Sequence, residues 1–220
     1  MPSPFDQSTY QVRLDWGIEG VARLAPADII VVVDVLRFSS TLPDAVAAGA
    51  EIPLANAVEW SSNGAAVVTA AAATGTIVLV GGIRNASAVA RAIAAIQERR
   101  GARTSVSVIA AGEVDARGVL RFAVEDHLGA GAIAAALTDL GIDHTAPEAA
   151  VAAEGFRALR GALRHLLTAS GSGRELEIGV ASTARMALSG ITPASTADAA
   201  AHDAIDVVPM LQDGAFVAFA

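Results

Sequence analysis

The sequence predicts an α/β fold, a three-layer α/β/α sandwich in which helices cover both faces of a largely parallel or mixed sheet. Residues 28–35, 76–80 and 104–110 are short runs rich in Ile and Val, the near-continuous hydrophobic pattern of strands buried on both faces. Ala-rich helical segments separate these runs, and strands that alternate with helices are typical of a parallel sheet. No linker rich in Pro, Ser or Gly divides the chain, so we expect one domain over residues 1–220, with a possible subdivision near 141–173.

The elements expected in the first half of the chain begin with a half-buried strand at Tyr10–Trp16, where apolar and polar residues alternate. The buried run 28–35 leads into a polar turn and then a helix over 42–48, with Pro43 tolerated in its first turn. The remaining elements of this half are a short strand over 51–54, a helix from Asn63 to about Gly75, the strand 76–80, and a helix from Asn85 or Ser87 to Arg100.

The second half continues the alternation of strands and helices. The buried run 104–110 precedes a polar turn, and a further strand is expected over 119–124. Asp126 is the expected N-cap of a helix that runs to residue 140, and Thr145 with Glu148 resembles a capping box. The remaining elements are a long helix from this box to about Thr168, an Ala-rich helical stretch after a flexible break at 170–173, and two late strands over 205–208 and 216–219.

The composition excludes several classes of function. The net charge is −8, all 15 basic residues are Arg, and aromatic residues make up 4% of the chain, so we expect no binding to nucleic acid or to a membrane. Because there is no Lys, a Schiff base, a P-loop lysine and a kinase lysine are impossible. Because there is no Cys, disulfides and thiolate chemistry are also excluded, and the cytoplasm is the expected location.

The residues that follow the buried strands are the candidates for a site, because ligands of open α/β sheets bind beyond the carboxyl ends of the strands. Asp34 ends the first buried run, where a carboxylate could hold a metal or act on a substrate. Arg37 could bind an anion with its planar guanidinium. Ser39, Ser40 and Thr41 precede the next predicted helix, whose first N–H groups favour phosphate. A capped helix beside a surface arginine explains the same residues without a ligand.

Two more turns enter helices in the same way. Asn63 and Gly64 could cap a helix, and the glycine would permit close approach of a ligand. Arg84 and Asn85 follow a Gly-Gly pair after the second buried run, where an anion pocket and a simple cap are equally good explanations. The third glycine of a dinucleotide fingerprint is absent, so an oxidoreductase of the Rossmann type is a weaker hypothesis.

A group of carboxylates follows the third buried run. Glu125 and Asp126 are adjacent at the start of a predicted helix, and Glu113 could join them and Asp34. Hard oxygen ligands of this kind suit Mg²⁺. Gly129 and Gly131 lie in the same helix, where glycine costs about 1 kcal/mol relative to alanine, so we expect something to pack closely there. A site that binds an anionic substrate together with a hard metal ion would explain why arginines, helix N-termini and carboxylates are all expected at one edge of the sheet.

The combination of motifs resembles the 2-phosphosulfolactate phosphatase family, the ComB-like proteins of coenzyme M biosynthesis. The motifs occur in the family's order: VVVDVLRFSST at 31–41, SNG at 62–64, RNASAVA at 84–90, VIAAGE at 108–113, AVEDHLGAGAI at 123–133, and DAIDVVP at 203–209. The pairing of DVLRFSST with EDHLGAG is the specific part. The chain is a compact member, because a stretch that the family carries before SNG is missing and residues 57–60 run directly into Ser61.

The resemblance implies an Mg²⁺-dependent phosphatase, a hydrolase that acts on the phosphate ester of 3-sulfolactate or of a related hydroxy acid. The positions that it carries over are Asp34, Arg37, Asn63, Asn85, Glu113, Glu125 and Asp126. We therefore expect Asp34, Arg37, Glu125 and Asp126 to be catalytic. The alternative is a non-catalytic protein that keeps the anion pocket and has lost the reaction. Faces rich in Ala permit a homodimer, and nothing in the sequence requires one.

Overall fold

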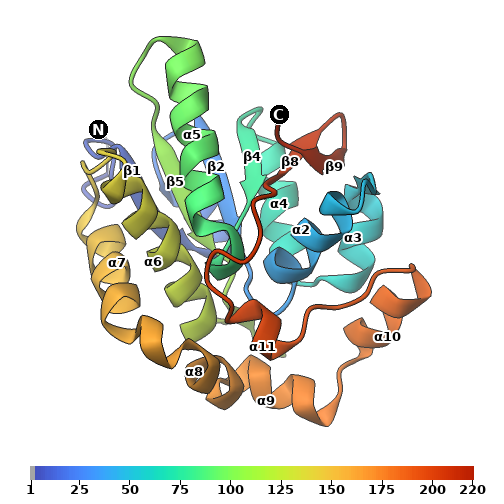
Figure 1. Cartoon of the computed structure of the whole chain (residues 1–220). Coiled ribbons are helices and arrows are strands. Elements are labelled where there is room, and N and C mark those ends of the chain that lie inside the picture. Colours follow the sequence, from blue (N-terminus) through green and yellow to red (C-terminus); the bar gives the residue numbers. More distant parts are fainter. Residues whose placement is uncertain (1–2) are drawn as a thin grey trace.

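The computed structural model describes residues 3–220; Met1 and Pro2, which the single-domain prediction includes, lie outside the described residues. A seven-stranded mixed sheet forms the centre of the protein, in the order β1-β5-β2-β4-β8-β9-β3 (Figure 1). The four strands β1, β5, β2 and β4 are parallel, and the other three are antiparallel to their neighbours. The seven strands are β1 (Val12–Trp16), β2 (Ile29–Val33), β3 (Ile52–Pro53), β4 (Ile77–Val80), β5 (Val106–Ala110), β8 (Pro209–Gln212) and β9 (Ala215–Ala218). The prediction of an α/β fold with a largely parallel or mixed sheet is confirmed.

Helices and one small hairpin complete the structure. The α-helices are α1 (Gly17–Arg23), α2 (Phe38–Ala47), α3 (Leu54–Trp60), α4 (Gly64–Ala72), α5 (Ala86–Arg100), α6 (Val124–Asp139), α7 (Pro147–Leu159), α8 (Leu163–Ala169), α9 (Gly171–Ile178), α10 (Ala181–Leu188) and α11 (Thr196–Ala199). Short 3₁₀ turns are η1 (Ile83–Asn85) and η2 (Arg160–Ala162), and β6 (Glu113–Val114) pairs with β7 (Leu120–Arg121). None of the helices within residues 3–220 combines the length and the apolar character needed to cross a lipid bilayer.

The alternation of side chains along the central strand divides the core into two layers. Val31 and Val33 of β2 pack against α5, α6 and α7, while Ile30 and Val32 pack against α2, α3 and α4. Successive residues of a strand point to opposite faces, so an uninterrupted Ile/Val run feeds both layers at once. Figure 1 shows α8, α9 and α10 running along one end of the sheet.

Helix α2 begins earlier than the sequence predicts, because side chains bond back to the preceding loop. Ser39 Oγ donates to the Asp34 carbonyl oxygen at 2.8 Å, and Ser40 Oγ donates to the Val35 carbonyl oxygen at 2.8 Å. These contacts close the turn at Phe38, so the expectation that residues 39–41 precede the helix is wrong. Pro43 lies inside the helix rather than in its first turn.

Two predicted caps and one predicted strand also differ from the structure. Ala123 is the N-cap of α6, and Asp126 lies inside the first turn of the helix. The proposed capping box at Thr145 is absent, since α7 begins at Pro147 after Ala146. The late strand begins at Pro209 rather than at residue 205, because it pairs with β9 through a tight turn. Both turn residues, Asp213 and Gly214, have positive φ, the backbone conformation that a two-residue hairpin turn needs.

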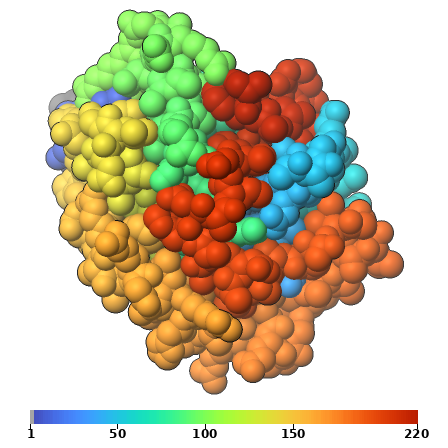
Figure 2. Space-filling view, viewed as in Figure 1, coloured from blue at the N-terminus to red at the C-terminus, as the bar shows by residue number. Residues whose placement is uncertain are grey.

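The segment that joins α11 to β8 lies on the surface between α5 and α2, where Figure 2 shows it as a continuous band. The backbone N–H of Ile205 donates to the Arg84 carbonyl oxygen at 3.0 Å. The Asp203 carboxylate accepts from the N–H and hydroxyl of Ser87 at 2.8 and 2.6 Å. These contacts hold the segment to the start of α5. The single-domain prediction, with its possible subdivision near 141–173, stays a prediction.

Candidate active site

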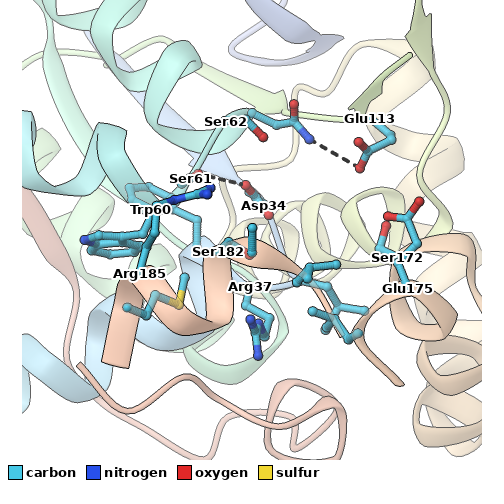
Figure 3. A pocket seen from close by; sticks show the side chains of 17 residues that line it. Asp34, Arg37, Trp60, Ser61, Ser62, Glu113, Ser172, Glu175, Ser182 and Arg185 are labelled. Carbon is cyan, nitrogen blue, oxygen red and sulfur yellow. Dashed lines mark hydrogen bonds between the residues drawn. The ribbon is translucent and has the colours of Figure 1, made fainter. Parts of the chain in front are cut away.

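A polar pocket of about 230 Å³ lies beyond the carboxyl end of β2. One wall is formed by Asp34, by residues 61–63 between α3 and α4, and by Glu113 after β5. The opposite wall is formed by α9 and α10 (Figure 3). Residues from widely separated parts of the chain therefore meet at the edge of the sheet where α/β proteins bind their ligands.

Asp34 is the most deeply placed acid of this pocket, with 9% of its surface exposed. Its Oδ2 accepts the backbone N–H of Gly64 at 2.9 Å and lies 3.4 Å from Ser61 Oγ. Burial, the largest cause, raises the pKa of Asp34 to about 6; the N–H groups of Gly64 and Phe38 oppose this rise, and the charges of Glu113 and Glu125 add to it. Asp34 is therefore ionised at neutral pH, although its burial and the neighbouring negative charges disfavour the ionised form.

The raised pKa of Asp34 predicts a pH-dependent stability in the absence of metal. The folded protein binds this proton more tightly than the unfolded chain, so stability falls as pH rises from about 4 through 6 and stays lower above that window. The difference is on the order of 3 kcal/mol, from about 1.4 kcal/mol for each pKa unit. We expect urea unfolding in EDTA to show the free energy of the native protein falling relative to that of Asp34→Asn over this window. A difference that does not vary with pH would contradict the assignment.

Gly64 fits closely against Asp34. A Cβ atom at this position would lie 2.6 Å from Asp34 Oδ2 and 2.8 Å from Phe38 Cδ1, both shorter than side-chain contacts allow. The close approach that the sequence predicts at Gly64 is thus made by a protein carboxylate. We expect Gly64→Ala to displace Asp34, to cost about 1–3 kcal/mol of stability as an overpacked core does, and to lower activity. Gly161→Ala is the matched control, because no atom lies within 4 Å of the Cβ it would add; equal losses from both changes would contradict the contact.

Glu113 and Asn63 face each other across the mouth of the pocket. Asn63 Nδ2 donates to Glu113 Oε2 at 3.3 Å, and Glu113 lies in the short strand β6 rather than in a turn. Burial, followed by the neighbouring charge of Glu175 on α9, raises the pKa of Glu113, while Asn63 and Arg121 oppose the rise. Figure 3 shows Ser172 and Glu175 together on the wall that faces Glu113.

Glu125 and Asp126 lie side by side in the first turn of α6 but have different surroundings. Asp126, 3% exposed, accepts the backbone N–H of Val35 at 2.7 Å with Oδ1 and that of Gly112 at 2.9 Å with Oδ2. It therefore ties the loop after β2 to the loop after β5. Glu125 is 2% exposed, and no hydrogen bond within residues 3–220 reaches its carboxylate. Burial and the charges of Asp34 and Glu125 raise the pKa of Asp126.

The four predicted metal ligands, Asp34, Glu113, Glu125 and Asp126, are all carboxylates, the donor type that suits a hard divalent cation. The charges of these acids affect one another. Glu113 and Glu125 raise the pKa of Asp34, and Asp34 and Glu125 raise the pKa of Asp126. The charge of Glu125 also raises the pKa of Glu113. Within the described residues, no three acidic or imidazole side chains already converge as a ligand set. A buried carboxylate without a hydrogen bond is costly unless a positive charge compensates it. The predicted ligands are hard oxygen donors whose negative charge the protein does not fully compensate, and donors of this kind suit Mg²⁺.

Arg37 lines the pocket but points away from Asp34 (Figure 3). Its Nη2 donates to Thr183 Oγ1 of α10 at 2.6 Å. Burial lowers the pKa of Arg37, and the charge of Asp34 partly restores it. The guanidinium therefore connects the loop after β2 with the opposite wall of the pocket.

The three residues predicted at a phosphate-binding helix start, Ser39, Ser40 and Thr41, direct their hydroxyl groups to other parts of the protein. Ser39 and Ser40 bond to the carbonyl groups of the preceding loop, and Thr41 Oγ1 accepts the backbone N–H of Ala194 at 3.1 Å. All three residues are at most 1% exposed, and none lines the pocket. They position Asp34 and the start of α2.

The second predicted anion turn is also part of the framework. Arg84 forms an ion pair with Asp44 and donates to the Ser40 carbonyl oxygen. Asn85, which is fully buried, accepts the Gly82 N–H at 3.0 Å and donates to the Val207 carbonyl oxygen at 3.0 Å. Neither residue lines the pocket.

The two helical glycines permit close packing, as the sequence suggests, but their neighbours are protein atoms. A Cβ at Gly129 would lie 2.6 Å from Val35 Cγ2, and one at Gly131 would lie 2.1 Å from the Ala152 carbonyl oxygen. Gly129 therefore lets α6 approach the loop after β2, and Gly131 lets α7 approach α6. Both lie outside the pocket.

The residues of the second wall were not predicted. Ser172 and Glu175 come from α9, and Ser182 and Arg185 come from α10. Both helices lie in segments that read as a flexible break and an Ala-rich tail of low complexity. The one available signal was the grouping of polar residues among alanines at 182–185.

A family model described as 2-phosphosulpholactate phosphatase matches residues 54–214. This range contains Asn63, Glu113, Glu125 and Asp126, and Asp34 lies before it. A search of curated proteins found no match to the chain.

Proposed function

The chain belongs to the 2-phosphosulpholactate phosphatase family, and on this premise we propose that it hydrolyses the phosphate ester of a small anionic acid with the help of Mg²⁺. The substrate that we propose is 2-phosphosulfolactate or a related phosphorylated hydroxy acid. The observation that carries the proposal is the buried Asp34, which lines a polar pocket and has a pKa raised to about 6; the charge of Glu125, a second buried carboxylate outside the pocket lining, contributes to that rise.

The residues that would hold the metal are Asp34, Glu125 and Glu113. Asp126 supports them, because both of its oxygen atoms already accept backbone N–H groups. When bound, Mg²⁺ supplies positive charge that stabilises the phosphoryl oxygens and can activate water. Above about pH 6, Asp34 is ionised and able to take part in such a site.

The remaining polar groups of the pocket suit a phosphorylated acid of a few carbon atoms. The cavity of about 230 Å³ is smaller than the roughly 300–1,000 Å³ that is typical of small-molecule pockets, a size that suits a compact acid. Arg37 and the hydroxyl group of Ser62 line it and are the donors we propose for the phosphate oxygens. A guanidinium binds phosphate through two parallel hydrogen bonds. Release of Arg37 from Thr183 would accompany binding.

The experiment that tests the function is phosphate release from a panel of phosphorylated small acids, including 2-phosphosulfolactate and phospholactate, with Mg²⁺ and again with EDTA. We expect release that depends on the metal. Absence of release from a folded protein would favour the alternative, a non-catalytic protein that binds the anion. The cytoplasmic location and the homodimer stay predictions.

A further inference from the structure

We infer that Arg185 on α10 is a specificity-determining residue that binds a second anionic group of the substrate, a carboxylate or sulfonate. The phosphate then lies at the acidic wall, the wall of the pocket that carries Asp34 and Glu113. This inference rests on the proposed function for the position of the phosphate. It assigns a role to a residue that neither the sequence motifs nor the proposed metal site includes.

The distribution of positive charge singles out Arg185. Among residues 3–220, only two arginines line the polar pocket, Arg37 and Arg185. Six other arginines form ion pairs with carboxylates: Arg23, Arg84, Arg91, Arg100, Arg117 and Arg157. Arg185 forms none within the described residues, although it belongs to an acidic protein with a net charge of −8. Arg37 and seven arginines outside the pocket also form no ion pair there, so the distinguishing feature of Arg185, an exposed residue, is its place at the pocket.

The hydrogen bonding of Arg185 orients it for an anion. Its Nε donates to the backbone carbonyl oxygen of Glu59, at the end of α3. No hydrogen bond within the described residues involves its two Nη groups. A guanidinium fixed through Nε keeps paired Nη donors, and such a pair can bind a carboxylate or sulfonate.

The surroundings of Arg185 provide a firm base for this contact. Trp60 and Met186 are 1% and 2% exposed, and both line the pocket beside it. Trp60 packs on Phe38 with ring centroids 5.7 Å apart, and Phe38 starts the helix that follows Asp34. Arg185 is thus joined through packed side chains to the segment that carries the acidic wall. Figure 3 shows Arg185 and Trp60 on the same side of the pocket.

The charges of the two walls predict how a substrate would lie. Asp34 and Glu113 on one wall require a cation before a phosphate can approach them. The opposite wall carries two charges of different sign: Glu175 on α9 lies near Glu113, and Arg185 on α10 can attract an anion without a metal. A short acid with a phosphate at one end and a carboxylate or sulfonate at the other matches this separation of charge, whereas an ester with an apolar tail does not.

The inference is tested with two esters that differ only in the second anion, phospholactate and isopropyl phosphate, in which a methyl group replaces the carboxylate. We expect the native protein to prefer phospholactate. We expect Arg185→Gln to reduce that preference, measured as the ratio of kcat/KM values, by about tenfold or more, mainly through a higher KM for phospholactate. Arg174→Gln is the matched control, since Arg174 is an exposed arginine of α9 outside the pocket. A ratio of kcat/KM values that stays unchanged in Arg185→Gln, because both esters lose equally or neither loses, would overturn the inference.

A binding measurement separates this inference from the proposed function. Sulfolactate, which has no phosphate, is titrated into each protein by calorimetry. We expect its Kd to rise by about tenfold or more in Arg185→Gln and to stay unchanged in Arg174→Gln. Equal affinity for the native protein and Arg185→Gln, or no binding to the native protein, overturns the role of Arg185. Failure of the native protein to release phosphate counts against the phosphatase proposal alone.

Discussion

Asp34→Asn is expected to lower kcat/KM for the phosphate ester by about 10³-fold, while the protein stays folded. Asparagine keeps an oxygen that can accept the Gly64 N–H, so the contact at 2.9 Å can survive. The negative charge is lost, and with it the proposed attraction for Mg²⁺. The charge also repels Glu113 and Glu125, so its removal is expected to leave the metal-free protein at neutral pH at least as stable as before.

The measurement combines phosphate release with urea unfolding of the same preparations. Asp206→Asn is the control, because the Asp206 side chain is 91% exposed and only pairs with Arg91 at the surface. We expect this control to keep native activity. Full turnover by Asp34→Asn would remove Asp34 from the active site, and an unfolded variant would show that its charge is needed for structure.

Asp126→Ala is expected to lower the free energy of unfolding by about 2–4 kcal/mol. The change leaves the buried N–H groups of Val35 and Gly112 without their acceptor, and each such loss costs about 1–3 kcal/mol. Relief of repulsion from Asp34 and Glu125, which raises the pKa of Asp126, offsets part of that cost. For a chain of 220 residues, this corresponds to a fall in Tm of about 5–15 °C.

Thermal and urea unfolding in EDTA test this role, because metal binding then contributes nothing. Asp139→Ala is the matched control on the same helix: the Asp139 side chain is 72% exposed and pairs with Arg157. Such surface pairs contribute about 0–1 kcal/mol. If Asp126→Ala is no less stable than Asp139→Ala, Asp126 does not brace the two loops, and its predicted role as a metal ligand becomes the better explanation of its burial.

The sheet could be predicted because its strands are hydrophobic runs that are visible in the local sequence, and the tertiary contacts of the fold agree with them. Runs such as Ile29–Val33 are strands because both faces of the sheet are covered, and five consecutive buried residues satisfy both layers. Boundaries were less predictable where a side chain bonds outside its own element. Ser39 and Ser40 move the start of α2 by bonding to the loop before it, and pairing with β9 moves the late strand to Pro209.

The prediction of the site also divides into features that the local sequence indicates and features that contacts between distant residues decide. The sequence by itself determined which chemistry is excluded: without Lys or Cys, lysine and thiolate mechanisms are impossible, and carboxylates and arginines are the charged groups that follow its buried strands. It also placed Asp34 at a strand end, because the Ile/Val run before it is visible without any structure. Polar residues at helix starts had two explanations, and the sequence does not distinguish a hydroxyl that contacts a ligand from one that contacts the backbone.

Only the tertiary structure decided between those explanations, since hydrogen-bond partners such as Val35 and Asp126 are distant in the chain. It assigned Ser39, Ser40 and Asn85 to the framework, and it buried Glu125 where no hydrogen bond from residues 3–220 reaches its carboxylate. It also brought Arg185 to the pocket from an Ala-rich segment whose composition carries little signal. A binding site is a property of surfaces that fold together, and neighbouring residues in sequence do not specify which surfaces meet.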